Sequence, residues 1–221
     1  MTTDPGFSIA PSVLSAAETT ELGRELSQLA HRSRAGVRHL MSCQAVAQVA
    51  HTKNLLALAS EALGRPAVPF RATLFDKSPR SNWLVVWHQD TALPLQARFD
   101  APGWGPWSLK ENIIYAHAPA DALARVVALR LHLDPSTSEN GPLRIIPGSH
   151  LLGLLSDDEI ANLVKAMPAE ECVVPAGGVL VMRPLHVHSS SKSTSAEPRR
   201  VLHIEYTDSF NLGSGIELAI A

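Results

Sequence analysis

The sequence contains three side chains of the types that hold a redox-active metal ion. His88 and Asp90 belong to a WHQD motif at residues 87–90, and His188 ends a PLHVH motif at residues 184–188. Residues two apart in an extended strand point to the same side, so His88 and Asp90 can offer a nitrogen and an oxygen to one ion. Two imidazoles and one carboxylate leave one face of the ion open, as a non-haem Fe(II) centre needs for a co-substrate and dioxygen. The three residues therefore predict oxygen chemistry.

Two features of this site stay open at the level of sequence. His186 shares a strand face with His188 and could coordinate in its place. Zinc is the competing metal, because it binds the same ligands more tightly than iron. Arg199, 11 residues after His188, favours iron, since its guanidinium could bind the carboxylate of an oxo acid through two parallel hydrogen bonds. Arg200 is the alternative anchor.

Length and composition restrict the class of protein. A chain of 221 residues fits a single domain, residues 1–221, with a full hydrophobic core. With 45% hydrophobic residues, 18% charged residues and a net charge of −2, we expect neither disorder nor a nucleic-acid partner. Cys43 and Cys172 form no motif, and neither a signal segment nor an apolar run of membrane-spanning length is evident. We expect a cytoplasmic protein without a membrane partner, and the oligomeric state stays open.

The elements that must position the metal ligands follow from the hydrophobic pattern. Residues 1–66 are predicted to be helical, with a capped helix over about residues 16–33 and a second helical stretch that ends before Gly64. In residues 67–221, short runs of β-branched and aromatic residues alternate with Gly and Pro turns, which predicts a β-sandwich or jelly roll. A capped helix is expected as an insertion near residues 156–167.

One segment does not fit this pattern of short strands and turns. Residues 100–107 are rich in Gly and Pro and contain Trp104 and Trp107. The segment is either a lid over the site or a connecting loop whose tryptophans cover the core, and the sequence does not decide between the two interpretations.

Further short motifs surround these ligands, and together they are far more specific than any one of them. They are WHQD at 87–90, LD at 133–134 with ENGPL at 139–143, IPGSH at 146–150, PLHVHSS at 184–190 and PRR at 198–200. In these motifs the chain from about Arg71 to Tyr206, about 60% of its length, resembles the phytanoyl-CoA dioxygenase family of Fe(II)/2-oxoglutarate oxygenases. The resemblance implies a mainly β fold with α: a double-stranded β-helix, or cupin-like jelly roll, with N-terminal helices packed on the major sheet.

The resemblance also implies roles for individual residues. The family's distal histidine stands in a His-x-Ser pattern, with the co-substrate arginine 11 positions later, which selects His188, Ser190 and Arg199. His88, Asp90 and His188 would then bind Fe(II), and His150 would serve the fold. The residues implied in binding 2-oxoglutarate are Arg199, Ser190, Gln89, Lys77 and Arg130.

The implied reaction oxidises a small-molecule substrate with dioxygen and releases succinate and CO2 from 2-oxoglutarate. Halogenating relatives carry a small residue at the position of Asp90, so the carboxylate favours hydroxylation or a related oxidation such as desaturation. No obvious basic cluster suits a CoA diphosphate, which favours a small molecule over an acyl-CoA. Two alternatives are a cupin-type metal enzyme, an isomerase or hydrolase that uses no oxo acid, and a non-catalytic binding module, against which the intact ligand set argues.

Overall fold

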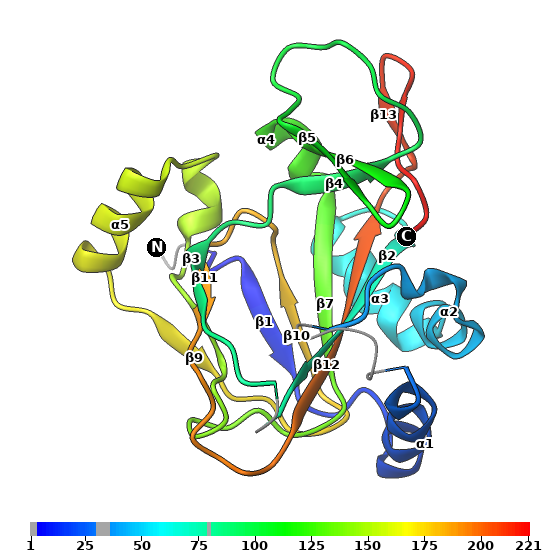
Figure 1. The fold of residues 1–221 in the computed structure, drawn as a ribbon, viewed down its shortest axis with the longest axis vertical. Helices are drawn as coiled ribbons and strands as arrows, with labels where there is room; N and C mark the ends of the chain where they lie inside the picture. Colours follow the sequence, from blue (N-terminus) through cyan, green and yellow to red (C-terminus); the bar gives the residue numbers. More distant parts are fainter. Residues whose placement is uncertain (1–3, 30–35, 79–80) are drawn as a thin grey trace.

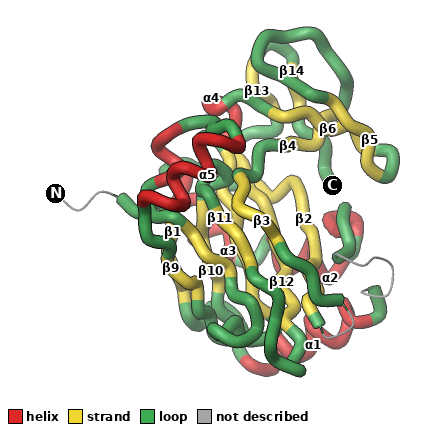
Figure 2. The backbone as a smooth tube through the Cα atoms, turned by 60° about the vertical axis from the view of Figure 1, so that its left-hand side comes forward, coloured by secondary structure: helices red, strands yellow, loops and turns green. Residues whose placement is uncertain are grey.

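Two antiparallel sheets that face each other form the main body of the protein (Figure 1, Figure 2). The computed structural model describes residues 4–29, 36–78 and 81–221. The larger sheet has the strand order β1 (Phe7–Ala10), β10 (Val179–Met182), β7 (Val126–His132), β12 (Arg199–Thr207) and β2 (Val68–Lys77). The smaller has the order β3 (Val85–His88), β11 (His188–Ser190), β8 (Leu143–Ile145) and β9 (Glu170–Cys172). The predicted jelly roll is confirmed.

The larger sheet divides its side chains between two environments, as β7 illustrates. Val127, Leu129 and Leu131 are fully buried in the core cluster that contains the N-terminal helices. The alternating residue Ala128 belongs instead to a cluster with residues of β8 and β9, between the two sheets. Because side chains of a strand alternate in direction, Arg130 also points into the space between the sheets. The inner face of the larger sheet therefore carries charge as well as apolar side chains.

The N-terminal part supplies helices that cover the outer face of the larger sheet (Figure 1). These elements are α1 (Ala16–Ser27), the 3-10 turn η2 (Leu40–Ser42), α2 (Gln44–Ala50) and α3 (Lys53–Leu63). The capping box of Ser15 and Glu18 begins α1 as predicted, but the helix ends at Ser27, and residues 30–33 of its predicted span lie outside the described part. The prediction that residues 1–66 are helical is wrong for β1. This edge strand has four residues and is too short to show a periodic pattern in the sequence.

Smaller elements sit around this body, and several of them frame the site. A three-stranded sheet has the order β4 (Ala92–Leu95), β6 (Ile113–His117) and β5 (Trp107–Lys110), and β13 (Asn211–Gly213) pairs with β14 (Ile216–Glu217). The short helical elements are α4 (Ala120–Leu123), η3 (Ser149–Leu152) and α5 (Asp157–Ala166). The inserted helix predicted near residues 156–167 is α5, and Ser156 caps it.

The Gly/Pro-rich segment leads from β4 into β5. The rings of Trp104 and Trp107 both pack edge-on against Phe99, with centroid distances of 5.2 and 5.0 Å. All three rings pack on a buried apolar cluster that includes residues of β4 and β6. The tryptophans thus cover part of the core, as one of the two interpretations predicts, and the lid interpretation stays a prediction.

Candidate active site

The smaller sheet brings the two histidines of the predicted metal site together. His88 is the last residue of β3 and His188 the first of β11, and they are direct partners in the antiparallel register. The centroids of their rings are 4.3 Å apart. Asp90 follows β3 immediately, and its backbone N–H donates to the carbonyl of Pro184 at 2.9 Å, which ties the two motifs to each other.

The carboxylate of Asp90 lies between the two imidazoles. Its Oδ1 is 3.6 Å from Nε2 of His88, and its Oδ2 is 3.6 Å from Nε2 of His188. All three potential ligand atoms lie within 4.8 Å of one another. An ion about 2.1 Å from each donor would connect atoms separated by about 3 to 4 Å, so this spacing suits one shared ion.

Both imidazoles are set to present a lone pair to such an ion. Nδ1 of His88 donates to the carbonyl of Val86 at 2.8 Å, and Nδ1 of His188 donates to the carbonyl of His186 at 2.9 Å. A ring that donates through Nδ1 keeps Nε2 free as an acceptor or metal ligand. Burial lowers the pKa of His188 to about 4, so this ring is neutral at pH 7, as a ligand must be.

The alternative ligand His186 lies elsewhere. Its Nε2 contacts the carbonyl of Pro5 at 2.9 Å, its Nδ1 contacts the carbonyl of Arg183 at 3.1 Å, and its ring packs against His150 with centroids 4.5 Å apart. Among the described residues, the cluster of potential metal ligands consists of residues 88, 90 and 188 and does not include His186.

Beside the three ligands is a cavity of about 110 Å³ that we call the inner chamber. It is lined by the three ligands together with Phe75, Lys77, Trp83, Arg130, Ser190 and Arg199. Three of these side chains are cations from three different strands of the larger sheet, and each is at most 7% exposed. Among the described residues, no carboxylate forms an ion pair with any of the three.

The hydrogen bonds of these cations leave their charge unneutralised. Nζ of Lys77 donates to Oγ of Ser190 at 2.8 Å and to a neighbouring carbonyl, and Arg199 donates to the same Oγ at 3.2 Å. Nε of Arg130 is buried without a hydrogen-bond partner. Burial and the adjacent arginines lower the pKa of Lys77 to about 8, and burial with Arg130 lowers the pKa of Arg199 to about 10.

A buried group of cations without acidic partners is costly unless a bound anion completes it. The donor set also fits a non-haem iron site, since two imidazoles and one carboxylate suit Fe(II) and leave coordination positions for other ligands. The residues present therefore fit both an iron ion and, next to it, an anionic co-substrate with more than one oxyanion group.

Comparison with known proteins places this arrangement in a family. The family model described as phytanoyl-CoA dioxygenase (PhyH) matches residues 4–201. The chain belongs to the phytanoyl-CoA dioxygenase family. The resemblance that the short motifs carry is thereby confirmed, and the protein is a non-haem oxygenase that depends on Fe(II) and 2-oxoglutarate and uses dioxygen.

Individual proteins are similar to this phytanoyl-CoA dioxygenase family member in sequence or in fold. An L-proline trans-4-hydroxylase of Streptomyces griseoviridis is 27% identical over 200 residues, which cover 77% of this chain and 67% of the relative. AviO1 of Streptomyces viridochromogenes Tue57 is 25% identical, with a TM-score of 0.67 over 93% of this chain and 90% of its own. EctD of S. alaskensis, in a structure with 2-oxoglutarate and 5-hydroxyectoine, has a TM-score of 0.68 at 17% identity, over 92% of this chain and 72% of its own.

Two other residues of the predicted site have structural partners. The guanidinium of Arg200 binds both carboxylate oxygens of Asp134 at 2.8 Å and donates to the carbonyl of Gly23. The amide of Gln89 donates to the carbonyls of Gly153 and Leu185 and accepts from a backbone N–H, so all its polar atoms connect β3 to nearby loops. Its role as an oxo-acid contact stays a prediction that these bonds do not support.

Several residues around the site were missed by the sequence analysis. Arg71 and Glu205 form a buried ion pair, and Arg71 lines a second cavity that also reaches Asp90. A signal was present in the strand that contains Arg71: Arg71, Thr73 and Lys77 stand an even number of residues apart, so these polar side chains share one face of the strand with Phe75. Polar residues at the core-facing positions of a buried strand mark a binding site rather than a packing face.

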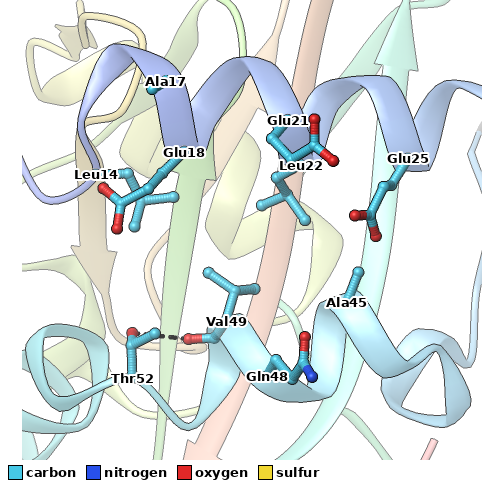
Figure 3. Close-up of a pocket in the computed structure, with 10 residues that line it drawn as sticks. All are labelled: Leu14, Ala17, Glu18, Glu21, Leu22, Glu25, Ala45, Gln48, Val49 and Thr52. Atoms are coloured by element: carbon cyan, nitrogen blue, oxygen red, sulfur yellow. Dashed lines mark hydrogen bonds between the residues drawn. The ribbon is translucent and has the colours of Figure 1, made fainter.

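A groove of about 510 Å³ between α1 and α2 contains none of the predicted site residues (Figure 3). Apolar side chains such as Leu22 and Val49 line it, together with the carboxylates of Glu18 and Glu21. Glu18 completes the capping box of α1, and Glu21 pairs with Arg24 at 2.6 Å. These two carboxylates therefore have local partners within or next to α1. Within the described chain, no helix combines the length and apolar character that crossing a bilayer requires.

Proposed function

We propose that His88, Asp90 and His188 bind the Fe(II) ion and that the inner chamber binds 2-oxoglutarate beside it. The observation that carries the proposal is the adjacency of two features: a two-histidine, one-carboxylate cluster, and three buried cations without acidic partners. 2-Oxoglutarate matches both, because it has one carboxylate next to a keto group that can chelate a metal and a second carboxylate at its far end.

Within the inner chamber we assign the far carboxylate to Arg199 and Lys77. Both cations already converge on Oγ of Ser190, which donates to the carbonyl of Gly141 at 2.8 Å and is thereby fixed in place. Gly141 has a φ of +66°, and a Cβ there would collide with the carbonyl of Ser191, so this turn requires glycine. Arg130 adds positive charge to the wall of the same cavity.

The reaction that we propose is hydroxylation of a small molecule. When bound, Fe(II) supplies the activation of dioxygen that is coupled to loss of CO2 from 2-oxoglutarate. One oxygen atom enters a C–H bond of the substrate to give C–OH, and the other enters the new carboxylate of succinate, so atoms and electrons balance. The residues hold the reactants close together, because the metal ligands and the cations line the same inner chamber.

Three observations support the choice of a small molecule and of hydroxylation. The relative from Streptomyces griseoviridis is named for hydroxylation of an amino acid, L-proline. The carboxylate of Asp90 occupies the position that halogenating relatives leave small. The two cavities that Asp90 lines are compact, at about 110 and 140 Å³. We also propose the cytoplasm as the site of the reaction, in keeping with the free thiols of Cys43 and Cys172.

Anaerobic titration with Fe(II) and 2-oxoglutarate tests the proposal directly. The chelate of the two should give a weak visible charge-transfer band that saturates at one equivalent of each. Asp90→Ala should lose the band and retain little iron after gel filtration, because one of the three protein ligands is gone. Succinate release under air should fall to the background level in the same variant.

Asp158→Ala is the matched control, because Asp158 is an exposed aspartate on α5 away from the metal cluster. It should keep the band, the iron content and the activity. A wild-type protein that binds iron but gives no band with 2-oxoglutarate would contradict the proposed co-substrate site. An Asp90→Ala variant with an unchanged band would contradict the ligand assignment.

A further inference from the structure

A second cavity, separate from the inner chamber, is also lined by Asp90. Its volume is about 140 Å³, and we call it the outer chamber; its walls include Arg38, Arg71, Phe75, Asp90, Lys110 and Tyr115. Phe75 and Asp90 line both chambers. A molecule in the outer chamber would therefore reach the candidate metal site without displacing a co-substrate from the inner one.

The cations of the outer chamber differ in how they are neutralised. Arg71 is paired with Glu205, a carboxylate that is 1% exposed, and also donates to the carbonyl of Ala92 at 2.8 Å. Arg38 and Lys110 form no ion pair with any carboxylate in the described part of the chain, and residues 1–3, 30–35 and 79–80 contain no Asp or Glu. Two positive charges without a carboxylate partner therefore line this space, one on the exposed side chain of Arg38 and one on the half-buried side chain of Lys110.

Local contacts hold these two cations at the same cavity. Val37 pairs with Leu74 of β2 through two backbone hydrogen bonds of 2.9 Å, which fixes the segment that carries Arg38. The ring of the next residue, His39, contacts the hydroxyl of Tyr115 at 3.0 Å. The ammonium of Lys110, at the end of β5, lies 4.7 Å from the centroid of the Tyr115 ring.

The charges act on each other across the cavity. Burial, followed by Arg38 and Arg71, lowers the pKa of Lys110 below its ordinary value, as expected for a half-buried cation with like charges nearby. The acidic groups nearby are already engaged: Glu205 pairs with Arg71, Glu111 lies 3.6 Å from His39, and Asp90 belongs to the metal cluster. An anionic group in the outer chamber would relieve this repulsion.

We infer that the primary substrate is a small organic acid whose carboxylate binds between Arg38 and Lys110, with its reacting C–H bond directed toward Asp90 and the metal. A guanidinium and an ammonium bind a carboxylate through charge-assisted hydrogen bonds, which are the stronger kind. This inference rests on the proposed function and names its substrate class. The small volume of the outer chamber is matched by an acid of amino-acid size and not by a long acyl chain.

One other cavity reaches the metal cluster and must be weighed against this. It has a volume of about 390 Å³, lies beside His88, and is lined by the segment around Gly105 and by the start of α5. No Lys or Arg of the described residues lines it, and it contains the carboxylate of Asp157. It lacks the charge that would orient an acid, so the outer chamber is the better site for one.

The inference is tested by binding, with pairs of small acids and their neutral amides as probes. Amino acids and short hydroxy and aliphatic acids, each beside its amide, would be added anaerobically to the protein with Fe(II) and 2-oxoglutarate. The readouts are the shift of the visible chelate band and the rise in melting temperature. At least one acid should produce both changes at a concentration where its amide produces neither.

Arg38→Gln and Lys110→Gln should each weaken binding of that acid by about tenfold while the titration with 2-oxoglutarate is unchanged. Lys165→Gln, which removes an exposed positive charge from the last turn of α5, should change neither and is the matched control. Circular dichroism and melting curves without ligand verify that each variant is folded.

The outcomes separate this inference from the proposed function. If the band forms but acids and amides act alike, if no acid in the panel binds, or if both variants bind the acid as the wild type does, the inference is wrong and the proposed function stands. If no band forms in the wild type, the co-substrate site is wrong. In that case, a rise in melting temperature that acids cause, that amides do not cause and that both variants lose still supports the anion site. The absence of such a rise overturns the anion site.

Discussion

The inner and outer chambers share Asp90 as part of their walls, and both present cations, yet they are built differently. The cations of the inner chamber, Lys77, Arg130 and Arg199, come from β2, β7 and β12 in the centre and at the edge of one sheet. The unpaired cations of the outer chamber, Arg38 and Lys110, come from a loop and from the end of a short strand.

This difference in construction matches the different tasks that we propose for the two chambers. A co-substrate that is the same throughout a family needs a fixed site, and sheet strands hold side chains rigidly. A substrate that varies among relatives needs a site that can change without disturbing the metal, and loops tolerate substitution. Asp90 and Phe75, which line both cavities, form a wall that the proposed co-substrate site and the proposed substrate site share.

The largest effect expected in the inner chamber comes from Arg199→Ala. Loss of a charge-assisted contact worth about 1.5–3 kcal/mol should raise the concentration of 2-oxoglutarate needed for half-saturation by about 10- to 150-fold. The preference for acids over amides in the outer chamber should be unchanged. Titration of the chelate band in the presence and absence of an acid measures both quantities.

Arg200→Ala is the natural comparison, because Arg200 is the adjacent residue but pairs with Asp134. It should lower the melting temperature and leave the affinity for 2-oxoglutarate intact. The reverse result, with normal co-substrate demand in Arg199→Ala and a large increase in Arg200→Ala, would move the anchor to Arg200.

A smaller effect is expected from pH, which should change the affinity of the inner chamber for 2-oxoglutarate. Because the pKa of Lys77 in the free protein is about 8, raising the pH removes its charge, and affinity for 2-oxoglutarate should fall by about tenfold between pH 7 and pH 9. Arg199 and Arg130 keep their charge over this range, so the decline should be shallow and involve one proton. Calorimetry at several pH values measures it.

Lys77→Gln should bind 2-oxoglutarate weakly at pH 7 and lose most of this pH dependence, whereas Lys165→Gln should keep it. An unaltered pH profile in Lys77→Gln would assign the titration to another group and remove Lys77 from the co-substrate site.

The smallest effect on ligand binding is expected from Gln89→Leu. The side chain makes three hydrogen bonds to backbone groups, so its loss should lower the free energy of unfolding by about 1–3 kcal/mol. Affinity for 2-oxoglutarate should be unchanged. Denaturant unfolding and the chelate titration decide the matter: weakened 2-oxoglutarate binding at unchanged stability would restore Gln89 as a co-substrate contact, as the family resemblance implies.

The sequence was sufficient to predict the jelly roll, the inserted helix and the helical cover, because each has a strong periodic or capping signal. The prediction was wrong where the signal was short. The edge strand β1 has only four residues, and the predicted helical stretch before Gly64 consists of two helices, α2 and α3, whose division at His51 and Thr52 the sequence did not indicate. Both depend on tertiary pairing and packing, which single-sequence patterns do not contain.

The site shows the same limit more clearly. His88, Asp90 and His188 could be predicted because spacing and motif select them, and the structure brings them together. Arg38 and Lys110 stand 72 positions apart in the chain and in no motif, so only the folded arrangement of the loop and the β5–β6 hairpin reveals that they share a cavity. Distant residues on loops are the part of a site that sequence reasoning finds last.

The hydrogen bonds from His88 and His188 to peptide carbonyls affect which mutations can disturb the candidate metal site during evolution. Each acceptor, at Val86 and at His186, is a backbone oxygen two positions earlier in the chain. No amino-acid substitution deletes a peptide carbonyl, so mutations that retune the neighbouring cavities leave both rings pointing the same way. The orientation of both Nε2 atoms toward Asp90 therefore depends on the backbone rather than on a neighbouring side chain.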